Sequence, residues 1–193
     1  MIDDLGLLAA RLALGASYAA HGAQKAFGWF EGPGPQGAAG MLESLGFKPG
    51  DAFATAASYG ELAAGTMIAL GLGGPIGPAL LISGMIVAQT TVHAKNGYFA
   101  QKGGIEVGTL YSTGALALAS SGYGDLSLDH AFGLDEKLRH PVVTTLALAG
   151  AIAAGYLVLA QRETSPPEGT EATPTIKGGE RNGSAEQPEP ART

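Results

Sequence analysis

Apolar residues fill five long stretches of this chain, separated by short polar or glycine- and proline-rich breaks. The stretches cover residues 5–27, 51–72, 76–94, 104–121 and 141–161. A helix rises 1.5 Å per residue, so about 20 residues cross the ~30 Å hydrocarbon core of a bilayer. The breaks contain sequences that end helices, such as PGP, GGP and KNG. This pattern predicts an all-α integral membrane protein whose helices form a bundle.

The composition changes abruptly after the last apolar stretch. Residues 163–193 are rich in Pro, Glu, Gly and Thr and have almost no aliphatic side chains. Such a segment buries too little apolar surface to offset the entropy lost on ordering. We therefore expect one transmembrane domain over residues 1–162 and a disordered polar tail over residues 163–193.

Strongly polar or ionisable residues interrupt four of the five apolar stretches. These residues are Arg11, His21, Lys25, Glu61, Gln89, His93 and Glu106, with Asn96 just beyond the third stretch. A charge at the centre of a membrane helix costs roughly 2.5 to 3.5 kcal/mol on insertion scales. Such residues persist where they pair, line a cavity or do chemistry, so they are the candidates for a functional site.

Helical spacing assigns these residues to faces and to depths. Arg11, His21 and Lys25 share one face of the first helix, and Gln89, His93 and Asn96 share one face of the third. The fifth stretch has few polar residues inside it, so we place it outside a four-helix core. Alternating helix directions gather most of the candidates in one half of the membrane. The members of that half are His21, Lys25, His93, Asn96 and Glu106.

Arg11 is expected toward the opposite side of the membrane, and its partner is not settled by the pattern. By helix rise alone, Arg11 and Glu61 are ~10 Å apart in depth. Asp125 and Asp129, in the following loop, are equally good partners for Arg11.

Positive charges set the predicted orientation in the membrane. Five spans place Lys25, Lys48, Lys95, Lys102 and Arg162 on one side. Lys137 and Arg139 lie on the other, so the positive-inside rule predicts an external N-terminus and a cytoplasmic C-terminus. The first apolar stretch has an acidic start and no cleavage site, so we expect it to be retained.

The residue inventory excludes several kinds of chemistry. The chain has no cysteine, which excludes disulfide exchange, thiolate nucleophiles and thiolate-ligated clusters. Its net charge of −6 comes without a basic patch for nucleic acid. His130 and His140 lie in an acidic loop but lack the spacing of metal ligands, so no metal site is predicted.

Three blocks of sequence resemble the DoxX family of small bacterial membrane proteins. They are RLALGASYAAHGAQKAFG at 11–28, GELAAGTMIALG at 60–71, and the longer block that starts NGYFAQKGGIE at 96 and ends SLD at 129. The resemblance implies a four-helix membrane bundle in the cytoplasmic (inner) membrane of a bacterium, and the fifth helix and the tail fall outside it.

The resemblance also implies a functional class, which is a membrane subunit linked to quinone in redox, sulfur or oxidative-stress metabolism. Glu106, His21 and Lys25 would then be the catalytic proton donors. Arg11, Glu61, Gln89, His93 and Asn96 would bind the quinone. Without its own electron carrier the protein would need a soluble redox partner.

Other interpretations of the same residues stay open. A small-molecule transporter or channel and a non-catalytic anchor for a soluble enzyme are the rival functions. The polar residues could also serve only to fix helix register through buried ion pairs. Ligation of a haem by His21 and His93 is a further, disfavoured reading, because histidines in a bundle are more often hydrogen-bonded residues.

Overall fold

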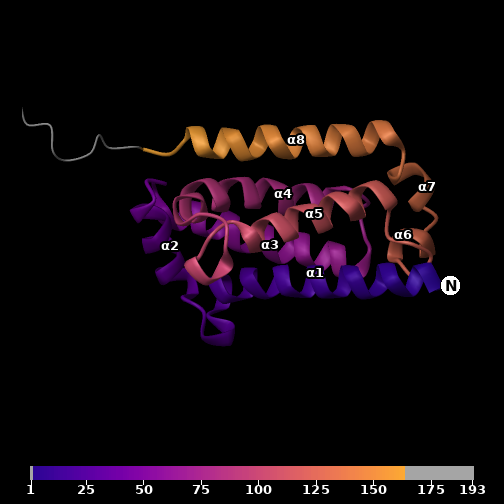
Figure 1. Cartoon of the computed structure of the whole chain (residues 1–193), viewed down its shortest axis with the longest axis horizontal. Coiled ribbons are helices and arrows are strands. Elements are labelled where there is room, and N and C mark those ends of the chain that lie inside the picture. Colours follow the sequence, from indigo (N-terminus) through magenta and orange to yellow (C-terminus); the bar gives the residue numbers. More distant parts are fainter. Residues whose placement is uncertain (1, 164–193) are drawn as a thin grey trace, which may run out of the picture.

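The protein consists of helices and turns throughout residues 2–163, the part of the chain that the computed structural model describes. Five long helices correspond to the five apolar stretches (Figure 1). They are α1 (Ile2–Phe27), α3 (Gly50–Leu70), α4 (Ile76–Ala88), α5 (Glu106–Ser121) and α8 (Pro141–Ala160). The predicted tail lies outside the described residues, apart from Glu163.

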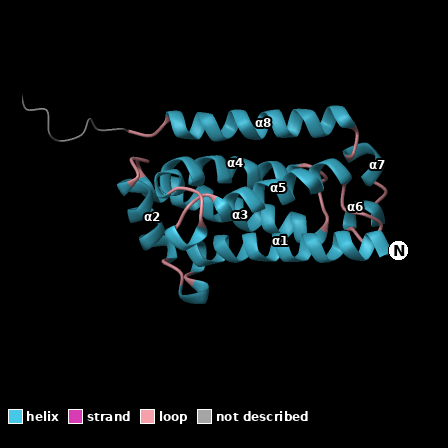
Figure 2. Ribbon diagram, viewed as in Figure 1, coloured by secondary structure: helices cyan, strands magenta, loops and turns pink. Residues whose placement is uncertain are grey.

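Shorter helices cap the two ends of the long ones (Figure 2). At one end α2 (Gly34–Ser44) packs on α3 and on the end of α1. At the other end, beside the N-terminus, lie α6 (Leu128–Ala131) and α7 (Asp135–Leu138) (Figure 1). The stretch GAAGMLESLGF, residues 37–47, is largely helical because most of it belongs to α2.

Helices α1 and α3 pack closely because glycines lie where their backbones meet. A Cβ atom on Gly15 would lie 2.5 Å from the Gly65 carbonyl oxygen, and one on Gly22 would lie 2.5 Å from the Leu62 nitrogen. Small residues let membrane helices approach and gain van der Waals contact that the hydrophobic effect does not supply in lipid. This packing sets the distance across which side chains of α1 and α3 interact.

The apolar core lies between α1, α3, α4 and α5. Its largest buried side chains include Tyr18, Ile68, Leu81 and Leu118. Tyr18 crosses from α1 to α4, because a Cβ atom on Gly84 would lie 2.4 Å from its hydroxyl oxygen. The four-helix core predicted from the polar faces is thus present.

Helix α4 continues without a break through a π-helical segment, η2 (Gln89–His93), and a short turn, η3 (Ala94–Asn96). The combined helix, Ile76–Asn96, and α8 are each long and apolar enough to cross a bilayer on their own. Helix α5, with 16 residues, is shorter than the ~20 that a full crossing needs. Its N-terminal end is extended by the turn η4 (Ala100–Lys102) and the residues that follow it.

Helix α8 lies on the outside of the bundle, as its scarcity of polar residues predicts (Figure 1). It packs mainly on α4, where Gly155 contacts Ile86. An apolar groove of about 230 Å³ remains between the two helices, beside Leu80 and Gly150. Beyond α8, the Glu163 nitrogen donates to the Gly46 carbonyl oxygen at 2.8 Å, which holds the helix end to the α2–α3 loop.

Candidate functional site

The predicted site residues occupy three separate places in the bundle. Lys25, Glu61 and His21 lie between α1 and α3 or beside α5. His93, Asn96 and Glu106 lie in the turn between α4 and α5. Arg11 lies at the opposite end of α1, against the loop that precedes α6. The polar residues that the sequence predicts as one site therefore lie in three separate sites with different neighbours.

Lys25 and Glu61 form an ion pair that joins α1 to α3. The Lys25 Nζ atom donates to Glu61 Oε2, and it also lies 3.4 Å from the His21 carbonyl oxygen. The two side chains retain 20% and 15% of their exposed surface. A pair with this exposure is neither fully buried nor fully solvated.

Aromatic and imidazole rings lie next to this pair on the same face of α1. The Tyr18 and Tyr111 ring centroids are 5.9 Å apart, and those of His21 and Tyr111 are 6.1 Å apart. Tyr18, His21 and Lys25 are spaced by three and four residues, so they line one side of α1. This group, here called the α1–α3 cluster, consists of Tyr18, His21, Lys25, Glu61 and Tyr111.

The residues of the α4–α5 turn contact the backbone of that turn. The Glu106 carboxylate accepts from the Ala100 N–H at 2.8 Å. Both His93 Nδ1, at 2.7 Å, and Asn96 Nδ2, at 3.2 Å, contact the Gly103 carbonyl oxygen. These contacts give all three residues a role in shaping the turn.

Gln89 begins the π-helical segment and packs across to α5. A Cβ atom on Gly108 would lie 2.8 Å from the Gln89 Cγ atom. A π-helical turn inserts an extra residue into an α-helix and is frequent at functional sites. Here it sets the direction in which Gln89 and His93 leave α4.

Arg11 is 2% exposed and pairs with none of the three carboxylates considered for it, Glu61, Asp125 and Asp129. Its Nη2 atom donates to the Leu126 carbonyl oxygen, while Nε and Nη1 have no hydrogen-bond partner among the described residues. The expectation that Arg11 reaches the loop near Asp125 and Asp129 is correct in position and wrong in partner. Glu61 is instead occupied by Lys25.

Asp129 accepts hydrogen bonds from two backbone groups of the α3–α4 turn. Gly73 and Gly74 donate their N–H groups to its two carboxylate oxygens at 2.8 and 2.7 Å. The Asp129 N–H in turn donates to the Gly71 carbonyl oxygen at 2.9 Å. This buried carboxylate therefore fastens the loop after α5 to the turn between α3 and α4.

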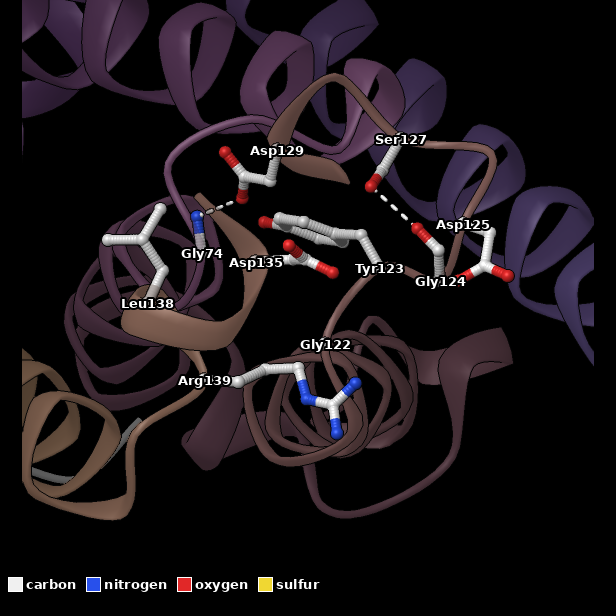
Figure 3. A pocket seen from close by; sticks show the side chains of 10 residues that line it. All are labelled: Gly74, Gly122, Tyr123, Gly124, Asp125, Ser127, Asp129, Asp135, Leu138 and Arg139. Carbon is white, nitrogen blue, oxygen red and sulfur yellow. Dashed lines mark hydrogen bonds between the residues drawn. The ribbon is translucent and has the colours of Figure 1, made fainter. Parts of the chain in front are cut away.

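A cavity of about 20 Å³ is lined by Asp129 and by the Tyr123 ring, among other residues (Figure 3). Tyr123 is 4% exposed, and its hydroxyl has no hydrogen-bond partner among the described residues. Burial raises the pKa of Tyr123, and the Asp129 carboxylate raises it further, so the phenol stays protonated. The cavity is about large enough for one water molecule.

Two titratable groups on the surface of the same end pair with each other. His130 Nδ1 lies 3.0 Å from Asp135 Oδ2. This hydrogen bond raises the pKa of His130 and lowers the pKa of Asp135. The described residues contain no cluster of three or more His, Cys, Asp or Glu side chains arranged for a metal ion.

Sequence reasoning missed two tyrosines that the structure places beside predicted residues. Tyr111 lies on α5 off the stripe formed by Glu106, Thr109 and Thr113, and Tyr123 lies in a turn rather than in a helix. Helical spacing contains no signal for Tyr123. The signal for Tyr111 is weak, because an aromatic residue in an apolar helix is normally part of the core.

Comparison with known proteins gives one match. The model of the DoxX family matches residues 6–94, which include α1, α2, α3 and most of the Ile76–Asn96 helix. The sequence block at 96–129 lies beyond the matched residues. No curated protein and no solved structure matches the chain.

Proposed function

We propose that this chain, whose residues 6–94 match the model of the DoxX family, is a membrane protein of that family and the membrane subunit of a quinone-linked oxidoreductase system. The α1–α3 cluster would bind the quinone head group. The observation that supports this function is the partly buried pair of Lys25 and Glu61, with His21 on the same face of α1 as Lys25 and in ring contact with Tyr111.

The chemistry of the cluster suits a quinone. A quinone supplies the redox chemistry by accepting two electrons and two protons, with the protons going to its two carbonyl oxygens. The Lys25 ammonium would donate a hydrogen bond to one such oxygen, and the Glu61 carboxylate and His21 imidazole would pass on protons taken up from the exposed side. Tyr111 would supply a flat apolar surface for the ring, with the buried Tyr18 ring packed against it.

Glu61 and Lys25 take precedence over Glu106 in this proposal. Glu106 already accepts from the Ala100 N–H, and its loss would disturb the turn before it disturbed any chemistry. Lys25 and Glu61 bind each other and do not hold a turn in place. The further contact of Lys25, at 3.4 Å, is to the His21 carbonyl oxygen within α1. Gln89, His93 and Asn96 would then shape the neighbouring wall, and Arg11 would hold the far end of α1.

The electrons would come from a soluble partner protein, because the chain has no cysteine for an iron–sulfur centre of its own. We place the protein in the bacterial cytoplasmic membrane with its C-terminus in the cytoplasm. The support for this orientation is that Lys25, Lys48, Lys95 and Lys102 lie at or beyond helix ends on one side of the bundle.

The test is the quinone content of protein purified gently from its native membrane. An ultraviolet–visible spectrum and a solvent extract are compared for the wild type and Glu61→Gln. We expect nearly one quinone per wild-type chain and a loss of at least tenfold in the variant. Glu136→Gln makes the same chemical change on an exposed residue of α7 and should keep the quinone.

Glu106→Gln separates this site from the alternative in the α4–α5 turn. Its amide oxygen still accepts from Ala100, so the variant should fold and keep its quinone. Loss of quinone in Glu106→Gln but not in Glu61→Gln would move the site to the turn. A folded wild type without quinone would contradict the proposal and favour the transporter or the anchor, and a Soret band would indicate haem.

A further inference from the structure

The turn between α4 and α5 carries two lysines, and the Glu106 carboxylate at the start of α5 contacts it through the Ala100 N–H. Residues 94–105 contain Lys95 and Lys102 and no Asp or Glu. Both lysines are exposed. The ion pairs found among the described residues use Lys25, Lys48 and His130 as their cations, and neither Lys95 nor Lys102 is among them.

Hydrogen bonds fold this turn back on itself and bring the two lysines to neighbouring positions. Asn96 Nδ2 donates to the Gly103 carbonyl oxygen at 3.2 Å, and these residues directly follow Lys95 and Lys102. The Ile105 N–H donates to the Gly97 carbonyl oxygen at 3.1 Å. The turn is thus a preformed surface, and ordering it for a ligand costs little entropy.

Two aromatic side chains project from the same turn. Tyr98 and Phe99 are 52% and 59% exposed, and their ring centroids are 5.4 Å apart. The Glu106 and Gly104 N–H groups donate to the Tyr98 and Phe99 carbonyl oxygens, which fixes the backbone from which the rings project. Exposed aromatic rings next to lysines are typical of the level of lipid head groups.

The turn also lies at the depth where a lipid head group is found. The helix Ile76–Asn96 is 21 residues long, which matches the ~30 Å hydrocarbon core at 1.5 Å per residue. Lys95 is the second-to-last residue of that helix, and Tyr98 through Lys102 follow at once. The turn therefore emerges from the membrane at the head-group layer.

We propose that the α4–α5 turn is a binding site for anionic phospholipid head groups. The Lys95 and Lys102 ammonium groups bind the phosphate, and the Tyr98 and Phe99 rings lie against the glycerol backbone and the first acyl carbons. Each lysine near an anionic surface raises affinity roughly fivefold. The site is independent of quinone binding at the α1–α3 cluster.

The test uses a tryptophan placed inside the turn. The chain has a single tryptophan, Trp29, so Trp29→Phe combined with Phe99→Trp gives one reporter at the site. The protein is reconstituted in phosphatidylcholine vesicles that contain either brominated phosphatidylglycerol or brominated phosphatidylcholine. Bromine quenches the tryptophan only on contact, so the two titrations compare the lipids at this position.

We expect the brominated anionic lipid to bind at least fivefold more tightly than the brominated zwitterionic lipid. Lys95→Gln with Lys102→Gln should bring that ratio close to one. Lys137→Gln with Arg139→Gln removes the same charge from exposed residues at the other end and should leave the ratio unchanged. High salt should lower the ratio in the reporter protein without any lysine change.

Equal quenching by the two lipids at low salt would overturn the proposal. A preference that survives high salt or the paired lysine substitutions would also overturn it, because the lysines would then not be its source. The salt titration decides the question even if the paired lysine variant does not fold. Quinone content is not part of the measurement, so failure here and failure of the proposed function are distinguishable.

Discussion

The two ends of the bundle use charged side chains in opposite ways. At the end near α6, Arg11 and Asp129 are each 2% exposed and bind backbone groups. At the other end, Lys25 and Glu61 are partly exposed and bind each other. A buried charge that satisfies backbone groups holds loops in place, whereas a partly exposed pair of side chains leaves polar atoms within reach of a ligand.

This difference explains why charge in a membrane domain does not by itself identify a functional site. Arg11, Lys25 and Glu61 lie in the long helices and carry the insertion cost that makes such charges rare, and Asp129 carries the cost of burying a charge in protein. Asp129 repays that cost by accepting the two N–H groups of the α3–α4 turn. Lys25 and Glu61 offset this cost through their mutual attraction, which persists only while both side chains are ionised.

The largest expected effect is at Asp129. Asp129→Ala leaves the partly buried Gly73 and Gly74 N–H groups without acceptors, and we expect a loss of about 2 to 4 kcal/mol of stability. Asp129→Asn keeps one acceptor and should lose about half as much. Thermal unfolding in detergent measures both, with Asp125→Ala on an exposed neighbour as the control. If Asp129→Ala left the stability unchanged but altered the quinone content, the end near α6 would be the ligand site and the account would be wrong.

A methyl group on Gly22 should separate α1 from α3 near the Lys25 and Glu61 pair. Its Cβ would lie 2.6 Å from the Ser58 carbonyl oxygen, so we expect Gly22→Ala to cost about 1 to 3 kcal/mol. The matched control is Gly60→Ala on α3, where a Cβ atom meets nothing within 4 Å. The control should be neutral or slightly stabilising, because alanine favours the helix. Equal unfolding temperatures for the two variants would contradict the close approach of α1 and α3.

The ion pair itself should contribute modestly to stability. A double-mutant cycle with Lys25→Gln and Glu61→Gln should give a coupling of about 1 kcal/mol, because solvent still screens the two side chains. The same variants should change quinone content far more than they change unfolding temperature. A coupling of several kcal/mol with normal quinone content would make this end structural as well.

The smallest effect concerns His130 and Asp135 on the surface near α6 and α7. The raised pKa of His130 means that the pair stabilises the fold fully below the unfolded pKa of His130. That contribution is lost as pH rises through the raised folded pKa. The lowered pKa of Asp135 means that its contribution is lost only as pH falls through that value. His130→Gln should therefore lower the unfolding temperature slightly in mildly acidic buffer and not in alkaline buffer; the reverse order would show that the two side chains do not pair.

Much of the fold follows from hydropathy and spacing. The apolar stretches predict the five long helices, and the scarcity of polar residues in 141–161 predicts that α8 lies outside the core. Spacing also places Arg11 at the opposite end from Lys25. These features depend on one helix at a time, so local sequence determines them.

The partners of the polar residues depend on several segments at once and were not predictable in the same way. Arg11 binds the Leu126 carbonyl oxygen because the loop after α5 folds back over Gly71. Every residue has a backbone carbonyl group, so the sequence does not indicate which one Arg11 binds. Glu106 faces Ala100 because the α4–α5 turn closes on itself. Loop geometry of this kind decides which neighbour a side chain meets.

The most direct test of the contrast between the two ends is photoaffinity labelling with an azido-quinone in native membranes, followed by peptide mapping. We predict labels on the residues around Tyr18 to Lys25 and around Tyr111, which Glu61→Gln abolishes and excess unlabelled quinone displaces. Displaceable labels confined to residues 122–139 would contradict the account, because they would place the ligand at the end that we assign to holding the loops.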